Sequence, residues 1–199
     1  MMEMNYLQTV LLLNSFGDKI CNAALAEEPM QNLMKSKEKY DIIIVENFFS
    51  ECFLGYAHIF KAPVVQISTF AGTEDQADIV GNPTPYSYIP DPFQEFDQNM
   101  DFKQRLMNTL GYLVQKVAKK FSIRRQNEIM RKFFHDPDMP SLEELQKSTA
   151  LVLVNHHFSI GSPRPLLPNY VMVGGMHIKP PKKLPTVSNI IIIIIIIIW

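Results

Sequence analysis

The chain has 199 residues, of which 47% are hydrophobic and 20% charged, and its formal net charge is −1. This composition is typical of a globular protein that is long enough to bury a core. A net charge near zero gives no general attraction to nucleic acid, so we expect no nucleic-acid partner. Basic residues are nevertheless concentrated in residues 101–132, which contain nine lysines and arginines but only two acidic residues.

The sequence shows neither a secretory leader nor a membrane span. No basic segment followed by an apolar one and a small-residue cleavage site opens the chain. No run of about 20 apolar residues is present either. Two cysteines, Cys21 and Cys52, do not make a disulfide framework in a chain of this size, and Cys52 fits the pattern of a small buried thiol.

The first forty residues are mostly helical in pattern. Residues 6–14 are apolar and do not distinguish helix from strand. Residues 22–39 have helical spacing, with a restart expected at Pro29. Their lysine-rich end suits a helix C-terminus, where positive charge is favourable.

Residues 40–70 are the most informative stretch, because they predict a β-α-β unit. The apolar, β-branched run at 42–45 is typical of a parallel strand buried on both faces. A helix is expected over residues 49–61 and a second strand over residues 64–67, joined by a right-handed crossover. Ligands of such sheets bind beyond the carboxyl ends of the strands, which places Glu46 and Phe70 at the functional edge.

Residues 71–100 are predicted to form a long loop rich in proline, glycine and aromatic residues. A loop of about 30 residues inside a domain is usually functional or disordered, and the aromatic residues argue against disorder. Two interpretations stay open. The aromatic side chains, among them Tyr86 and Tyr88, pack on the surface, or they line a pocket for an apolar ligand.

Residues 101–134 form the longest helical pattern, with Asp101 as the N-cap. Apolar residues recur every three or four positions, at Phe102, Leu106, Leu110, Leu113, Val117 and Phe121. The basic residues fall mostly elsewhere on the helix. They indicate a solvated face, a membrane-surface contact or, least of all, a nucleic-acid contact.

The last part of the domain alternates short helix and strand. Ser141 opens a capping box and a short helix that ends near residue 147. Strands are predicted at residues 150–154 and 171–173. Residues 176–187 have the proline and lysine content of an extended interdomain linker, and we expect the isoleucine-rich segment 188–199 not to belong to the working protein.

Few residues carry recognisable chemistry. The sequence contains no G-x-G-x-x-G, P-loop or G-x-S-x-G motif. His156 and His157 follow a strand, and adjacent strand residues point to opposite faces, so we expect no metal site there. Glu46 could orient or deprotonate a histidine, or it could simply face a helix N-terminus.

Three segments together resemble one enzyme family. They are YDIIIVENFFSECFLGYAHIFKAPVVQIS at residues 40–68, GNPTPYSYIP at residues 81–90 and LVLVNHHFSIGSPRPLLPNYVMVGGMHIKPPKKLP at residues 151–185. These segments resemble the acceptor-binding half of animal UDP-glycosyltransferases, with an insect-like character. The resemblance extends from about residue 21 to residue 185.

The resemblance implies a GT-B architecture, in which two Rossmann-like halves enclose the reaction cleft. The N-terminal half binds a small lipophilic acceptor, and the C-terminal half binds the UDP-sugar and is anchored in the endoplasmic reticulum membrane. A histidine deprotonates the acceptor hydroxyl, a carboxylate orients that histidine, and the sugar is transferred by direct inverting displacement. No metal or cofactor is implied, since the UDP-sugar is a co-substrate.

The resemblance also implies which residues of this sequence occupy the positions of the family's site residues. Glu46 corresponds to the orienting carboxylate, with Glu51 as a weaker candidate, while the catalytic histidine belongs to a segment that this sequence does not show. Phe70, Tyr86 and Tyr88 are candidate acceptor contacts.

We therefore expect an α/β fold: an incomplete Rossmann-like parallel sheet flanked by helices, over residues 1–175. The expected function is that of a UDP-glycosyltransferase fragment, inactive by itself, with UDP-sugar as a partner only in a full-length enzyme. The alternative is a non-enzymatic module that binds a lipophilic ligand or regulates a partner. A further alternative is a protein that contacts a membrane surface through residues 101–134.

Overall fold

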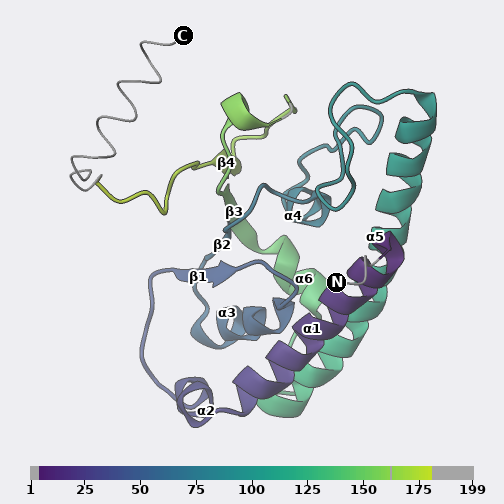
Figure 1. The fold of residues 1–199 in the computed structure, drawn as a ribbon. Helices are drawn as coiled ribbons and strands as arrows, with labels where there is room; N and C mark the ends of the chain where they lie inside the picture. Colours follow the sequence, from purple (N-terminus) through teal and green to yellow (C-terminus); the bar gives the residue numbers. More distant parts are fainter. Residues whose placement is uncertain (1–4, 162, 181–199) are drawn as a thin grey trace, which may run out of the picture.

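The structure is a computed structural model that describes residues 5–161 and 163–180. At its centre lies a sheet of four parallel strands in the order β1-β2-β3-β4, flanked by helices (Figure 1). The strands are β1 (Ile43–Glu46), β2 (Val64–Ser68), β3 (Thr149–Val154) and β4 (Tyr170–Met172). The predicted α/β class and the Rossmann-like parallel sheet are confirmed. Residues 181–187 of the expected linker and the isoleucine-rich segment lie outside the described residues.

The predicted β-α-β unit is present, with β1 and β2 paired in parallel from Ile43↔Val64 to Glu46↔Ile67. The helical segment between them has two parts, the 3-10 helix η1 (Glu51–Leu54) and α3 (Gly55–Phe60). Helix α3 ends at Lys61, whose left-handed φ of 50° and the following Pro63 prevent a further turn. Sequence periodicity places the segment correctly but does not separate its two helical geometries.

The prediction that β1 is buried on both faces is wrong for the described chain. Strand β1 pairs only with β2, so it forms one edge of the sheet, and the Ile44 side chain is 64% exposed. Strand β2 has a partner on each side, and four of its five residues are buried. The apolar run at 42–45 therefore marks a strand but does not reveal how many neighbours cover it.

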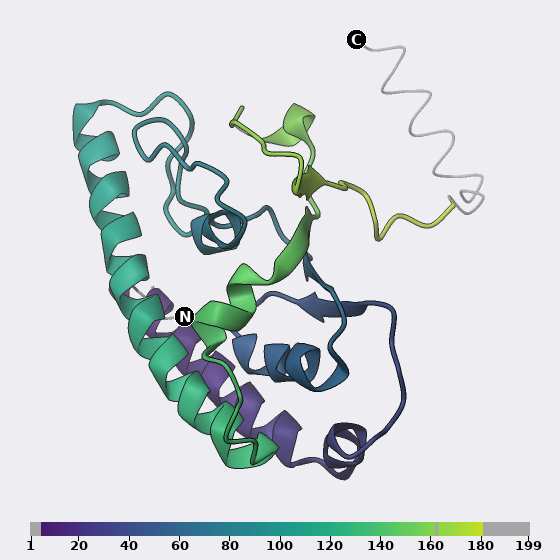
Figure 2. The same cartoon turned by 180° about the vertical axis from the view of Figure 1, so that it is seen from behind.

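Two long helices, α1 (Tyr6–Ala26) and α5 (Phe102–Phe134), lie side by side along one flank in both views (Figures 1 and 2). They run in the same direction, because Tyr6 contacts Gln115 near one end of the pair and Asp18 contacts Arg125 further along. The ambiguous segment at residues 6–14 is thus helical, and the predicted helix at 22–39 is divided between α1 and α2 (Glu28–Met34).

Helix α5 begins as predicted but buries an unexpected face. Asp101 accepts a hydrogen bond from the Gln104 backbone N–H at 2.8 Å and completes a capping box. The apolar residues of the predicted stripe are exposed, and the buried side consists of Asn108, Gly111, Tyr112, Ser122, Ile123, Gln126 and Met130. Small and amide side chains let α1 and the loop before α5 approach closely, so the core-facing side is not the most apolar one.

The remaining helices are short. Helix α4 (Glu74–Ile79) lies inside the segment predicted as loop, α6 (Leu142–Lys147) follows the predicted capping box at Ser141, and the 3-10 helix η2 (Phe158–Ile160) follows β3. The main apolar core lies between the sheet, α5 and α6, with Val64, Ile123 and Leu142 among its buried members. In the described part of the chain, every helix is too short or too polar to cross a membrane.

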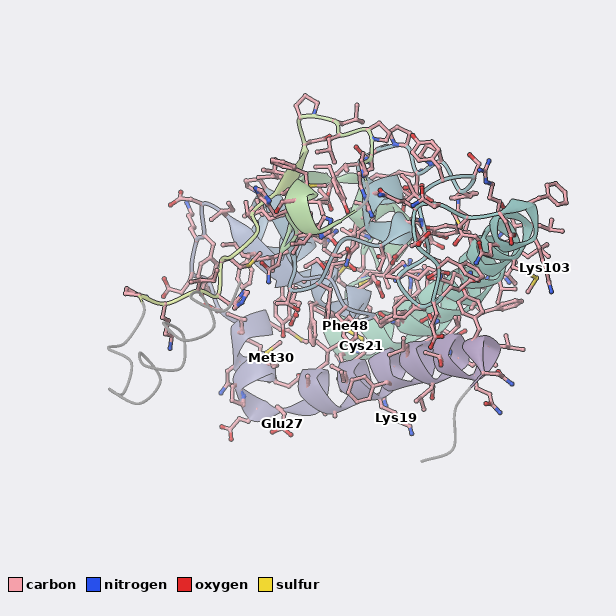
Figure 3. All side chains as sticks on the ribbon, turned by 45° about the horizontal axis from the view of Figure 1, so that its top comes forward. Lys19, Cys21, Glu27, Met30, Phe48 and Lys103 are labelled. Carbon is pink, nitrogen blue, oxygen red and sulfur yellow. A yellow bond between two sulfur atoms is a disulfide. The ribbon has the colours of Figure 1, made fainter. Side chains whose placement is uncertain are left out.

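Cys21 and Cys52 form a disulfide bond between α1 and η1, with their Cα atoms 6.0 Å apart. The interpretation of Cys52 as a free buried thiol is therefore wrong, although both cysteines are fully buried. Figure 3 shows Cys21 on the side of α1 that faces the rest of the molecule, whereas Lys19 lies on the outer side of the same helix. The bond fixes the second half of α1 against the β-α-β unit.

Candidate functional site

Polar groups gather where the parallel strands end. Glu46 ends β1, Thr69 follows β2 and Asn155 follows β3. The Thr69 hydroxyl donates to Glu46 Oε1 at 2.8 Å, and Asn155 Nδ2 donates to the Thr69 carbonyl oxygen at 3.2 Å. Asn155 Nδ2 also lies 3.2 Å from His177 Nδ1. These four residues, which we call the rim, form an exposed polar row across three strand ends.

Glu46 occupies the predicted position at the sheet edge and is accessible. It lines a hollow of about 410 Å³ beside β1, whose other walls are largely apolar. Among the described residues, only Thr69 hydrogen-bonds its side chain. The weaker candidate, Glu51, is 4% exposed and forms an ion pair with Lys119, so its carboxylate serves the packing of η1 against α5.

The predicted acceptor contacts lie apart from one another. Phe70 is half exposed and packs against Phe48, with ring centroids 5.0 Å apart. The ring of Tyr86 stacks on that of Tyr112 of α5, with centroids 4.4 Å apart, and Tyr88 is nearly half exposed. None of the three lines the hollow beside β1 or the cavity that α1, α4, α5 and α6 border. Their role as acceptor contacts stays a prediction.

The two strand-end histidines have different surroundings. His156 is buried, and its ring would collide with a Cβ at Gly161, whereas His157 is exposed and its Nδ1 lies 2.7 Å from the Ser159 hydroxyl oxygen. Burial lowers the pKa of His156, and the charges of Arg164 and His157 lower it further. Within residues 5–161 and 163–180, no three potential metal-ligating side chains converge.

A second hollow, which we call the α-cavity, was not foreseen from the sequence. It has a volume of about 450 Å³ and is bordered by α1, α4, α5 and α6 together with Phe49. Its apolar wall residues are Val10, Leu13, Phe49, Ile79, Phe93 and Ile123. Since these come from five separate segments, only the folded chain brings them together.

Phe49 is held at the α-cavity by an unusual backbone arrangement. It has a φ of 55°, a left-handed conformation that side-chain-bearing residues rarely adopt. Its carbonyl oxygen accepts a hydrogen bond from Gln126 Nε2 at 2.8 Å. A Cβ at Gly17 would lie 1.8 Å from that same oxygen, so the glycine is what allows α1 to approach.

The loop before α5 is fixed by one buried amide. Asn108 Nδ2 donates to the carbonyl oxygens of Tyr86 and Ile89, both at 2.8 Å, and its Oδ1 accepts from the Asp91 backbone N–H at 2.8 Å. This full use of the amide anchors residues 86–91 on α5. The loop is thus packed on the helix, which is the first of the two interpretations offered by the sequence for Tyr86.

Two lysines in the wall of the α-cavity form ion pairs with neighbouring carboxylates. Lys119 lies 2.9 Å from Asp75 and also forms an ion pair with Glu51, and Lys116 lies 3.1 Å from Asp78. Burial lowers the pKa of Lys119, but the nearby carboxylates of Asp75 and Glu51 outweigh this and raise it above its ordinary value. The lysine is therefore charged at neutral pH.

Glu74, the first residue of α4, lies in the same wall but outside these ion pairs. Only 3% of it is exposed, one of its oxygens lacks a hydrogen-bond partner, and it lines the α-cavity. Burial raises the pKa of Glu74 to about 9, with the Asp75 carboxylate as the next cause. Its carboxyl group is consequently protonated at neutral pH.

A parallel sheet with helices around it is the arrangement of a Rossmann-like domain, and here polar groups lie at its carboxyl edge. The sequence model of the family described as UDP-glucoronosyl and UDP-glucosyl transferase matches residues 2–192. The chain belongs to this family, which confirms the resemblance seen in the sequence.

Individual relatives come from insects and vertebrates. The chain is 33% identical over 158 residues to UDP-glycosyltransferase UGT5 of Dactylopius coccus. This match covers 79% of the chain and 30% of the relative. It is 36% identical over 151 residues to UDP-glucosyltransferase 2 of the same species, and this match covers 74% of the chain and 29% of the relative. It is also 32% identical over 184 residues to UDP-glucuronosyltransferase 3A1 of Homo sapiens. That match covers 88% of the chain and 32% of the relative.

The chain thus spans about a third of the length of the curated relatives it matches. No solved structure matches it.

Proposed function

We propose that these residues form the acceptor-binding half of an enzyme that transfers a sugar from a UDP-sugar to the hydroxyl of a small lipophilic acceptor. Family membership supports sugar transfer. The α-cavity carries the acceptor part of the proposal, because its 450 Å³ and its apolar walls are those of a small-molecule site. Phe49 and Glu74 bring its wall close to the ends of β1 and β2.

In the proposed reaction the acceptor oxygen attacks the anomeric carbon of the sugar, and the bond from that carbon to the UDP oxygen breaks. The hydroxyl proton passes to a base, and Glu46 orients that base. The exposure of Glu46 at the open edge of β1 supports this role, since a group beside β1 can reach the carboxylate. The reaction as proposed uses no metal or cofactor.

We infer that the enzyme works at the endoplasmic reticulum, on its lumenal side. The disulfide between Cys21 and Cys52 supports this location, because such bonds persist in oxidising compartments and are rare in the cytosol.

Titration of the chain with the fluorescent phenol 1-naphthol tests the acceptor part. We expect saturable binding, and no naphthyl glucoside when UDP-glucose is added, because the proposal assigns sugar binding to the other half of the enzyme. The urea-unfolded chain is the control for non-specific partition. Fluorescence that rises linearly without saturation, or clear formation of the glucoside by this chain, contradicts the proposal.

A second candidate function is contact with a membrane surface. Helix α1 exposes Leu11, Leu12 and Phe16, and α5 exposes the apolar stripe that includes Leu113 and Val117. Exposed apolar stripes on two adjacent helices mark an interaction surface. Exposed basic residues on α5, namely Lys103, Arg105, Lys116, Lys120, Arg124, Arg125, Arg131 and Lys132, favour an anionic lipid surface as its partner.

We expect the chain to sediment with vesicles that contain phosphatidylserine, and less so as salt concentration rises, because salt screens the attraction of the basic residues. Leu113→Glu with Val117→Glu should reduce the bound fraction about tenfold, since charges on the apolar stripe oppose insertion. Ile160→Glu is the matched control, because Ile160 is 80% exposed but lies on η2. Equal losses in both variants would contradict a specific role for α5.

A further inference from the structure

We propose that residues 190–198 of the isoleucine-rich segment add to the open edge of β1 as a further, antiparallel strand, and that their side chains fill the apolar hollow beside β1. We thus assign a role to a segment that, from its sequence alone, we expect not to belong to the working protein. The reason is the open edge of β1, which the sequence does not reveal.

The backbone of β1 has hydrogen-bonding groups that β2 does not use. The Ile43 and Asn47 N–H groups donate to carbonyl oxygens in or next to β2, at 3.0 and 2.8 Å. Because backbone groups alternate in direction along a strand, the N–H and C=O groups of Ile44 and Glu46 face away from β2. None of the described strands lies on that side. An edge of this kind is a template for pairing with another strand.

The side chains at this edge are apolar and exposed. Ile42 is 49% exposed and Ile44 is 64% exposed. The hollow of about 410 Å³ beside them is walled by aromatic and aliphatic side chains of α2, η1 and α3, namely Met30, Leu33, Phe53, Tyr56 and Phe60. Proteins usually cover or charge an edge strand, because an exposed apolar one pairs with other chains. The edge therefore has the chemistry of a site for an extended apolar segment.

Residues 190–198 match this site in composition. They are consecutive isoleucines, and isoleucine is among the residues most enriched in strands. A strand without polar alternation is typical of places where both of its faces are covered. Beside β1, one row of isoleucine side chains fills the hollow and the other row continues the apolar surface around Ile44, so both rows gain apolar contacts.

The chain is long enough to reach the edge of β1. After β4 it turns back across the end of β3, where the Gly175 N–H donates to Asn155 Oδ1 at 3.0 Å and Asn155 Nδ2 lies 3.2 Å from His177 Nδ1. From β3 to a strand outside β1 is three strand spacings, or about 14 Å. The chain from His177 to Ile190 spans up to about 40 Å when extended. In both views the described chain leaves the molecule on the side opposite α5 (Figures 1 and 2).

The direction and the choice of edge follow from this path. A segment that arrives from the carboxyl ends of the strands runs antiparallel to β1. The other edge strand, β4, has three residues, and it borders neither the hollow beside β1 nor the α-cavity. Strand pairing uses backbone groups, so the Glu46 carboxylate keeps its hydrogen bond to Thr69.

Backbone amide exchange, measured by NMR on the chain of 199 residues, tests the proposal residue by residue. We expect the Ile44 and Glu46 amides to exchange slowly, because the added strand accepts their hydrogen bonds. Ile193→Pro with Ile194→Pro should speed this exchange by at least about tenfold, since proline inside a strand removes donors and breaks the pairing. Ile193→Val with Ile194→Val is the matched control, because valine keeps the β-branched shape. The Asn47 amide, which bonds to the Ile67 carbonyl oxygen, should be protected in all three chains.

Fast exchange at Ile44 in the unsubstituted chain overturns the proposal, and so does protection of Ile44 that persists in the proline variant. Protection of Met172 without protection of Ile44 overturns it as well, because the segment then covers the edge at β4. Sedimentation equilibrium identifies whose segment is bound. A monomer with a protected Ile44 amide supports the proposal, whereas protection found only in a dimer assigns the added strand to a second copy and overturns it. None of these outcomes depends on whether the α-cavity binds an acceptor.

Discussion

Lys119→Met is expected to destabilise the fold by roughly 3–5 kcal/mol, the typical cost of removing one partner from a buried ion pair. The Lys119 side chain is 16% exposed and lies between Glu51 and Asp75, and the Glu51 side chain is only 2% exposed. Methionine preserves much of the apolar stem but leaves two carboxylates facing each other without a cation. Urea unfolding at pH 7, followed by circular dichroism, measures the loss.

Lys120→Met is the matched control, because Lys120 is the next residue on α5 and is exposed. Its effect should stay within about 0.5 kcal/mol, as for most surface substitutions. The difference between the Lys119 variant and the unsubstituted chain should shrink in acid. Burial raises the pKa of Asp75, but Lys119 outweighs it and holds the pKa below its ordinary value. The stability from this pair is thus present at neutral pH and lost as pH falls through that lowered pKa. Equal effects of the two substitutions at pH 7 would contradict a buried cation at Lys119.

Reduction of the disulfide between Cys21 and Cys52 is the second large effect that we expect. The bond closes a segment of 31 residues. In the chain-entropy description, opening a loop of this length costs roughly 3–4 kcal/mol of unfolding free energy. The measurement is urea unfolding with and without dithiothreitol, at equal ionic strength.

The double variant Cys21→Ala, Cys52→Ala provides the control. It should unfold near the midpoint of the reduced chain and should not respond to dithiothreitol. Because α1 packs along α5 and borders the α-cavity, we also expect reduction to weaken 1-naphthol binding. An unchanged urea midpoint after complete reduction, established by thiol titration, would show that the bond does not stabilise this fold.

Local signals in the sequence account for much of the fold. The β-α-β unit follows from an apolar β-branched run, a helical pattern and Pro63, which all act within about 25 residues. Asp101 and Ser141 mark helix starts because a cap is a local hydrogen-bond arrangement. The same kind of signal was present at Thr73, whose capping box with Gln76 begins α4, and it could have divided the segment predicted as loop.

Features that depend on distant partners could not be predicted in this way. The run at 42–45 has the composition of a central strand, yet Ile44 is exposed and lines an open hollow, and β1 has one neighbour among the described strands. The cysteine pair is joined only because α1 packs against η1. The apolar stripe of α5 faces outward, since Asn108 and Gln126 form the buried contacts instead.

The candidate site also has one part that the sequence predicts and one part that it does not. The position of Glu46 at the sheet edge follows from parallel topology, and the structure places it there. The α-cavity depends on how α1, α4, α5 and α6 pack, and in the sequence Glu74 looks like an ordinary surface residue. Its burial, and the lack of a hydrogen-bond partner for one of its oxygens, become visible only in the folded chain.

Obstruction of the α-cavity is the most direct test of the proposal that this chain is an acceptor-binding half. Leu13 lines the α-cavity, and Leu12, the next residue on α1, is 55% exposed. Saturable binding of 1-naphthol should be lost, by more than about tenfold in affinity, in Leu13→Trp, because the indole fills the space, and it should persist in Leu12→Trp. If both folded variants bind 1-naphthol as the unsubstituted chain does, the acceptor does not bind in the α-cavity.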